Sequence, residues 1–366
     1  MSLKKDRFNI FDKKYMRFAI NLAKNQNGLT GTNPSVGCVI VKNKKIISYG
    51  ATNFNGRPHA ETIALNKNKH NNFGSSIYLT LEPCSHYGKT PPCTKAIIKS
   101  KVKKVYYSIE DTDLKCFKKS KKILKSKNIY TKSGLLIKNV KKLYKNYDYI
   151  KKNKMPYVIG KLACSSNLYI LKNNKLITNE HSRNVGHLLR YKNQGILTSY
   201  KTINTDNPKL NCRINGLENF SPIKLIIDKD LKINTRSYIV NNSNKIKTVI
   251  FHNSKNIKKI NNLKYNKIKL IYLGINKYGY IDLKKIFIKI YDMGIHNLLV
   301  ECGNTLTSNI LKEKLFNEFY LFKSSKNINN KDGIHVKNIN KTLNRTFKSK
   351  KNINTYLDND LLIHYY

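Results

Sequence analysis

The sequence has no tryptophan, only eight arginines and no long apolar run. A membrane-spanning helix needs roughly 18 uncharged apolar residues, and no stretch of this chain approaches that length. Residues 1–14 are charged rather than apolar, unlike a secretory signal, so we expect a cytoplasmic protein with no membrane partner. The seven cysteines are odd in number and widely scattered, a pattern that does not indicate a disulfide framework.

Acidic residues are also scarce, with 21 Asp and Glu against 70 Lys and Arg and a formal net charge of +49. Such an excess is typical of proteins that bind a polyanion. Nearly all of it is lysine, however. Lysine, asparagine, isoleucine and tyrosine are encoded by A/T-rich codons, so a mutational bias of the genome could produce this charge. The charge is therefore weak evidence, and we expect no nucleic-acid partner.

The 366 residues suffice for two domains, since a domain commonly has about 100–200 residues. Apolar residues make up 40% of the chain, enough for two cores. A linker at 151–156 is expected to separate a domain of residues 1–150 from a second α/β domain of residues 156–366. In the first half, helices and strands alternate, which predicts an α/β fold with parallel strands; they are helices at 15–25, 60–66 and 94–100 and strands at 36–41, 46–50, 76–81 and 102–108.

One histidine and two cysteines have the spacing of a catalytic zinc site. His59 lies at the start of a predicted helix, and Cys84 and Cys93 each follow a proline. Three protein ligands leave the fourth tetrahedral position for water, whose pKa zinc lowers from about 15.7 towards 7. Glu61, two residues after His59, is placed to carry the proton of that water to a leaving amine. This H-x-E and P-C pattern is the signature of zinc nucleobase deaminases.

A structural zinc site is the alternative, and it needs a fourth protein ligand. His86 could supply one, although it lies only two residues after Cys84, which is an awkward spacing for a shared site. The prolines beside both thiols and the glutamate after His59 favour the catalytic interpretation.

Three segments of the first half resemble the riboflavin-biosynthesis bifunctional deaminase/reductase family: residues 33–41 (NPSVGCVIV), 58–61 (PHAE) and 80–93 (TLEPCSHYGKTPPC). The eight-residue spacer between the cysteines separates this family from most cytidine and tRNA adenosine deaminases. The resemblance implies a cytidine-deaminase-like three-layer α/β domain followed by a dihydrofolate-reductase-like α/β domain. The first would deaminate a phosphoribosylaminopyrimidine with Zn²⁺, and the second would reduce its ribosyl group to ribityl with NADPH.

The second half resembles the same family at residues 182–190, 202–213 and 300–306. Arginine can fork onto a phosphate dianion, and a glycine before a helix offers backbone N–H groups to phosphates. By resemblance, the NADPH contacts are Ala163, Thr202, Asp206 and Gly303. By the same resemblance, the substrate contacts are Asn33, Lys89, Arg190, Leu210, Arg213 and Glu301.

Several positions depart from the family pattern. In the deaminase half, Thr52 replaces a histidine, and Asp113 lies in a segment that usually reads D-P-N-P. In the reductase half, Asn167 and Leu168 replace an Asp-Gly pair, Leu176 replaces a tryptophan, and the loop between them is about three residues short. Leucine does not freely take the positive φ that glycine permits. A deaminase with a decayed reductase domain and a tRNA or nucleic-acid deaminase are therefore kept as alternatives, and a homo-oligomer is left open.

Overall fold

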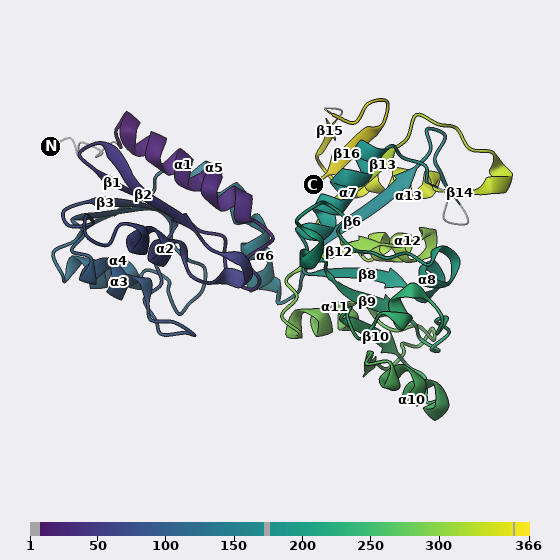
Figure 1. Cartoon of the computed structure of the whole chain (residues 1–366). Helices are drawn as coiled ribbons and strands as arrows, with labels where there is room; N and C mark the ends of the chain where they lie inside the picture. Colours follow the sequence, from purple (N-terminus) through teal and green to yellow (C-terminus); the bar gives the residue numbers. More distant parts are fainter. Residues whose placement is uncertain (1–7, 172–175, 354–355) are drawn as a thin grey trace. The chain divides into compact units, whose positions relative to one another are not determined.

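The computed structural model describes residues 8–171, 176–353 and 356–366. The chain divides into two compact units, the first ending at Lys154 and the second beginning at Met155 (Figure 1). The first half of the linker expected at 151–156 is helical, because α6 (Lys145–Asn153) continues to Asn153 and ends where Lys154 takes a φ of 52°.

The first unit contains a five-stranded sheet in the order β2-β1-β3-β4-β5. Its first two strands form the predicted antiparallel hairpin, and β3, β4 and β5 run parallel, as the helix–strand alternation predicts. The short fifth strand was not predicted, because it lies in a lysine-rich segment without a clear apolar pattern. The strands are β1 (Gly37–Lys42), β2 (Lys45–Ala51), β3 (Ser76–Leu81), β4 (Lys104–Ile109) and β5 (Tyr130–Ser133).

Helices cover both faces of this sheet and make three layers (Figure 1). On one face α1 (Ile10–Gln26) packs beside α5 (Ile137–Leu143), and on the other α2 (Ala60–Lys67) is followed by α3 (Cys93–Lys99) and α4 (Lys119–Lys125). The first helix starts at a capping box formed by Asn9 and Asp12. It lies so close to β1 that a Cβ on Gly37 would come within 1.9 Å of the Ala19 carbonyl oxygen, so only glycine fits there.

The second unit contains a nine-stranded sheet in the order β11-β10-β9-β8-β12-β6-β13-β16-β15. Its strands are parallel from β11 to β13, and the two C-terminal strands are antiparallel. The strands β9, β10 and β11 are added one after another on one side of β8. The next strand, β12, lies on the other side of β8. The strands are β6 (Tyr157–Cys164), β8 (Gly195–Ser199), β9 (Ile223–Ile227), β10 (Thr248–His252), β11 (Lys269–Tyr272), β12 (Asn297–Glu301), β13 (Glu318–Lys323), β15 (Lys350–Ile353) and β16 (Leu361–Tyr365).

Helices pack on this sheet, and a small two-stranded sheet lies beside it. Open parallel sheets bind ligands outside the carboxyl ends of their strands, at the point where the strand order reverses. In this unit that point lies between β8 and β12. The helices are α7 (Glu180–Tyr191), α8 (Tyr200–Asp206), α9 (Tyr238–Asn241), α10 (Ile257–Tyr265), α11 (Leu283–Asp292), α12 (Asn304–Lys312) and α13 (Lys337–Thr346), and the small sheet pairs β7 (Tyr169–Leu171) with β14 (Gly333–His335).

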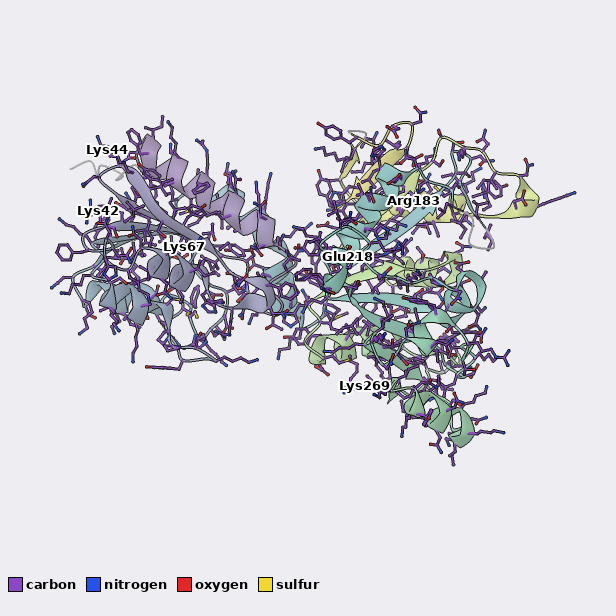
Figure 2. The ribbon with its side chains drawn as sticks, in the orientation of Figure 1. Lys42, Lys44, Lys67, Arg183, Glu218 and Lys269 are labelled. Atoms are coloured by element: carbon purple, nitrogen blue, oxygen red, sulfur yellow. The ribbon has the colours of Figure 1, made fainter. Side chains whose placement is uncertain are left out.

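The lysines are spread over both units. Lys42, Lys44 and Lys67 lie on different elements of the first unit, and Lys269 lies on β11 of the second (Figure 2). None of the helices in the described ranges is long and apolar enough to span a bilayer.

Candidate active sites

Three side chains from three elements of the first unit converge on one point. His59 precedes α2, Cys84 follows β3, and Cys93 is the first residue of α3. The Nδ1 atom of His59 lies 3.6 Å from Cys84 Sγ and 3.4 Å from Cys93 Sγ. The backbone N–H of Cys93 also donates to Cys84 Sγ, at 3.2 Å. The β3 strand end and the two helix starts therefore bring residues that are 34 positions apart into one ligand set.

This donor set fits zinc. Tetrahedral zinc with Zn–S bonds of about 2.3 Å and Zn–N bonds of about 2.0 Å holds sulfur and nitrogen about 3.5 Å apart, as the two S–N distances are here. A hydrogen bond from the Cys93 thiol, together with one from His59, lowers the pKa of Cys84 to about 4. The bond to Cys84 and burial raise the pKa of Cys93, so the pair holds one thiolate before a cation binds.

Glu61 lies beside this ligand set, in the first turn of α2, and is 3% exposed. It lines the same cavity of about 120 Å³ as His59 and Cys84. Burial raises the pKa of Glu61 to about 7. A buried carboxyl group with such a pKa can accept and return a proton near neutral pH, which is what general acid–base catalysis requires.

His86, the alternative fourth ligand, is directed elsewhere. Its Nδ1 lies 3.1 Å from the Sγ of Cys116, and the described residues contain one group of three metal-ligating side chains, His59, Cys84 and Cys93. A four-ligand structural site built with His86 is therefore not formed here.

The other residues that the sequence singled out in this half do not all line the cavity. Asn33 lines the cavity and donates from Nδ2 to the Gly56 carbonyl at 2.9 Å. Thr52, which replaces the family histidine, lines it too and accepts the Val36 N–H through Oγ1 at 2.9 Å. Lys89 is exposed, although its neighbours on both sides line the cavity.

Glu82 is a residue that the sequence analysis missed. It is buried and accepts hydrogen bonds from the backbone N–H groups of Asp111, Lys118 and Ser120 at 3.0–3.3 Å, and from the Ser120 hydroxyl at 2.8 Å. It thereby fixes the loop that carries Asp111 and Asp113 to the cavity. The signal in the sequence was a carboxylate at the end of a buried strand, directly before Pro83 and Cys84.

In the second unit, Arg190 and Glu301 form a two-pronged ion pair. The guanidinium of Arg190, on α7, donates to both carboxylate oxygens of Glu301, at the end of β12, at 2.8 and 2.9 Å. Lys161 on β6 lies 3.7 Å from the same carboxylate. Burial alone would raise the pKa of Glu301, but Arg190 and Lys161 outweigh it and lower the pKa to about 2.

The chain after α8 adds further polar groups to this pair. The Asn211 carbonyl accepts from Arg190 Nη1 at 3.2 Å, and its side-chain oxygen accepts from Arg213 Nη1 at 2.9 Å. His187 Nδ1 lies 3.1 Å from the same carbonyl. The three predicted residues Arg190, Arg213 and Glu301 thus belong to one cluster. His187 and Asn211 lie in the two segments that resemble the family but were not predicted as site residues, and Lys161 lies outside those segments.

The predicted cofactor residues lie around the reversal of strand order. Gly303 is the N-cap of α12, two residues after the end of β12, and a methyl group placed on it would meet no atom within 4 Å, so the space beside its Cα is open. Thr202 and Asp206 lie on α8, directly after β8, and Ala163 lies on β6. The Thr198 hydroxyl near the end of β8 is buried without a hydrogen-bond partner among the described residues. A helix start without a side-chain cap and an unpartnered hydroxyl at this point fit a nucleotide cofactor.

Three leucines in this unit, Leu168, Leu210 and Leu231, have left-handed backbones, and the first two are positions that the sequence singled out. Leu168, which replaces the family glycine, takes a φ of 66°, so the glycine-like conformation is kept at a steric cost. Leu210 takes a φ of 49°, and its buried side chain packs in a core cluster. Leu176 is exposed, and the shortened loop before it includes residues 172–175, which lie outside the described residues.

Comparison with known proteins shows the family of both halves of the chain. The model of the cytidine and deoxycytidylate deaminase zinc-binding region matches residues 10–109, and that of the RibD C-terminal domain matches residues 158–332. The riboflavin biosynthesis protein RibD of Aquifex aeolicus is 30% identical over 362 residues, covering 96% of this chain and 97% of the relative. The chain belongs to the RibD family.

Other RibD proteins agree along the whole length. RibD of Buchnera aphidicola is 32% identical over 332 residues, covering 86% of this chain and 87% of the relative. A solved structure of Acinetobacter baumannii RibD superposes with a TM-score of 0.83 at 26% identity, covering 97% of this chain and 98% of the other. The predicted fold class, the pairing of a zinc deaminase with a reductase, and the cofactors zinc and NADPH are confirmed by this membership.

Proposed function

We propose that this RibD protein removes an amino group hydrolytically from 2,5-diamino-6-(phosphoribosylamino)pyrimidinone and then reduces the ribosyl group of the product to ribityl. A solved relative from Thermotoga maritima, 25% identical with a TM-score of 0.78, is described as a diaminohydroxyphosphoribosylaminopyrimidine deaminase and 5-amino-6-(5-phosphoribosylamino)uracil reductase. The observation that carries the proposal is the ligand set of His59, Cys84 and Cys93 with Glu61 in the same cavity.

In the deaminase half, residues 1–150, we assign His59, Cys84 and Cys93 as zinc ligands and Glu61 as the catalytic residue. Zinc, when bound, is a Lewis acid that makes water nucleophilic at neutral pH. Glu61 takes up a proton from the attacking water and gives it to the departing amine, which leaves as ammonia. Its burial, which raises its pKa to about 7, suits both transfers. Asn33 on the cavity wall orients the pyrimidine, and Lys89 stays a prediction as a substrate contact.

In the reductase half, residues 156–366, we assign Arg190, Arg213, Leu210 and Glu301 to the substrate. Arg213 provides forked donors for the phosphate. Arg190 can add only the N–H groups that remain, because Glu301 accepts from its Nε and Nη2 and the Asn211 carbonyl accepts from its Nη1.

NADPH, when bound, supplies the hydride. We assign Gly303 and the start of α12 to its phosphates and Thr202, Asp206 and Ala163 to the remainder of the cofactor. The left-handed backbone at Leu168 means that replacing the family glycine has not changed the conformation at this position, which supports a working reductase over a decayed one. We place the enzyme in the cytoplasm as part of this proposal, and a homo-oligomer stays a prediction.

Two separate assays test the two halves. Ammonia release from the diaminopyrimidine substrate, measured with the zinc content, tests the first, and NADPH oxidation with the deaminated product tests the second. We expect turnover in both. Deamination without NADPH oxidation would leave a deaminase alone, and preferential deamination of tRNA would favour the nucleic-acid alternative.

A further inference from the structure

The helix α6 forms part of the wall of the deaminase cavity. Tyr147 and Lys151 lie four residues apart, and therefore on one face of this helix, and both line the cavity. The Tyr147 hydroxyl donates to Asp111 Oδ1 at 3.1 Å, and Lys151 Nζ donates to Asp113 Oδ2 at 2.8 Å. Asp111 and Asp113 line the cavity as well, so these two contacts join an acidic segment of the wall to α6.

Carboxyl groups outnumber lysine and arginine side chains on this wall. Among the described residues, the carboxyl groups that line the cavity are those of Glu61, Glu82, Asp111 and Asp113, and the two cations are Arg57 and Lys151. Three of the four carboxyl residues are buried, whereas 28% of the Asp113 side chain is exposed. Of the four, Asp113 is therefore the carboxylate most accessible to a ligand that enters the cavity from solvent.

Asp113 is ionised at neutral pH. Burial alone would raise its pKa, but the Lys151 ammonium group and the Lys115 N–H outweigh burial and hold the pKa below its ordinary value. The Lys115 N–H donates to Oδ1 at 3.0 Å, while Lys151 occupies Oδ2. Without Lys151, this carboxylate would keep the backbone donor but have no ion-pair partner among the described residues.

A phosphorylated substrate is an anion, so an uncompensated carboxylate on the cavity wall would oppose its binding. Resting on the proposed deaminase function, we propose that Lys151 determines the preference for a phosphorylated substrate, because its ammonium group neutralises Asp113 on a wall rich in carboxyl groups. Lys151 acts through Asp113 and is a positioning residue, not a catalytic one. The two side chains are 33% and 28% exposed, so the pair contributes little to stability and a variant without it should fold.

The test compares kcat/KM for the phosphorylated substrate and for its dephosphorylated analogue. Lys151→Met keeps an unbranched apolar stem beside the Tyr147 ring and removes the charge. The KM for the phosphorylated substrate should rise roughly 5- to 15-fold, the effect of one charge on another about 10–15 Å away at an effective dielectric constant of about 20. The zinc content, kcat and the KM for the analogue should be unchanged. Lys152→Met removes an exposed charge from the next position of α6 and is the matched control, which keeps the preference.

The double variant Lys151→Met/Asp113→Asn tests the compensation directly. The amide of asparagine has the shape of the carboxylate and can accept the Lys115 N–H, but it has no charge to be neutralised. The preference for the phosphorylated substrate should therefore return to that of the wild type, so that the two substitutions are strongly non-additive. An unchanged preference in Lys151→Met, or a loss that Asp113→Asn does not restore, would overturn the proposal.

Two further results are decisive. An equal loss for both substrates in Lys151→Met would mean that Lys151 supports the shape of the wall and not its charge, and would overturn the proposal. If Lys151→Met unfolds or loses zinc, Asp113→Asn alone decides: removal of the carboxylate should keep or increase the preference, and a decreased preference contradicts the proposal. Wild-type turnover with an unaltered preference in the variants refutes only this inference. Absence of wild-type turnover refutes the deaminase function and this inference with it.

Discussion

Glu301→Gln is expected to destabilise the second unit strongly at neutral pH. The carboxylate of Glu301 is 11% exposed and lies between Arg190 and Lys161. These cations lower its pKa from 4.5 to about 2, which corresponds to about 3 kcal/mol of stabilisation. The amide of glutamine keeps the shape and loses the charge, so two buried cations are left without their counter-charge.

The pH dependence follows from the direction of this shift. Because the pKa is lower in the folded protein, the stabilisation is fully present above about pH 4.5 and is lost as the pH falls towards 2. At pH 3 the difference between wild type and variant should have fallen to roughly half or less of its value at pH 7.

Urea unfolding followed by far-UV circular dichroism measures this difference, with zinc release as a separate report on the first unit. The effect should appear in the transition of the second unit and leave zinc release unchanged. A loss below about 1 kcal/mol at pH 7, the range of an exposed ion pair, would refute the reasoning, and so would a loss of the same size at pH 7 and pH 3.

Three further outcomes are expected. Glu61→Gln should keep its zinc, measured by mass spectrometry of the metal. Its deamination rate should fall by about 10²- to 10⁴-fold, while NADPH oxidation continues. A variant that deaminates at the wild-type rate would exclude Glu61 from proton transfer. Cys84→Ser, or a chelator, should remove zinc and deaminase activity and leave the reductase assay unaffected; bound zinc in the variant would contradict the ligand assignment. Leu168→Ile keeps the side-chain volume but adds a branch at Cβ beside a positive φ, so thermal unfolding should show a loss of about 1–2 kcal/mol, and an unchanged melting temperature would mean that the backbone is not strained.

The zinc site was largely predictable, because its chemistry is local in sequence. His59 and Glu61 lie in one short segment, each cysteine follows a proline, and three ligands without a fourth indicate a catalytic metal. The structure added the contacts between them and showed that His86 faces Cys116 instead. Glu82 was missed for the opposite reason, since its hydrogen bonds reach residues 29 to 38 positions later.

The second unit was harder to predict in detail. Its buried strands were clear from their apolar runs, but short elements such as β7, β14 and β15 have little apolar pattern of their own. Lys161 joins the cluster around Glu301 only because β6 and β12 are neighbours in the sheet, and no residue near it in sequence marks it. His187 lies on α7 three residues before Arg190, but only the packing of α7 shows that its ring reaches the cluster.

The sequence by itself determined the α/β class of both halves, the zinc ligands and the family resemblance, because apolar periodicity and ligand spacing are properties of short segments. Only the tertiary structure decided which charged side chains have a partner of opposite charge. Among the described residues no carboxylate pairs with Arg57, whereas Asp113 pairs with Lys151, and Arg190 and Lys161 hold the pKa of Glu301 well below its usual value. The physical reason is that the energy of a charge depends on its burial and its neighbours, which the packing of distant segments sets.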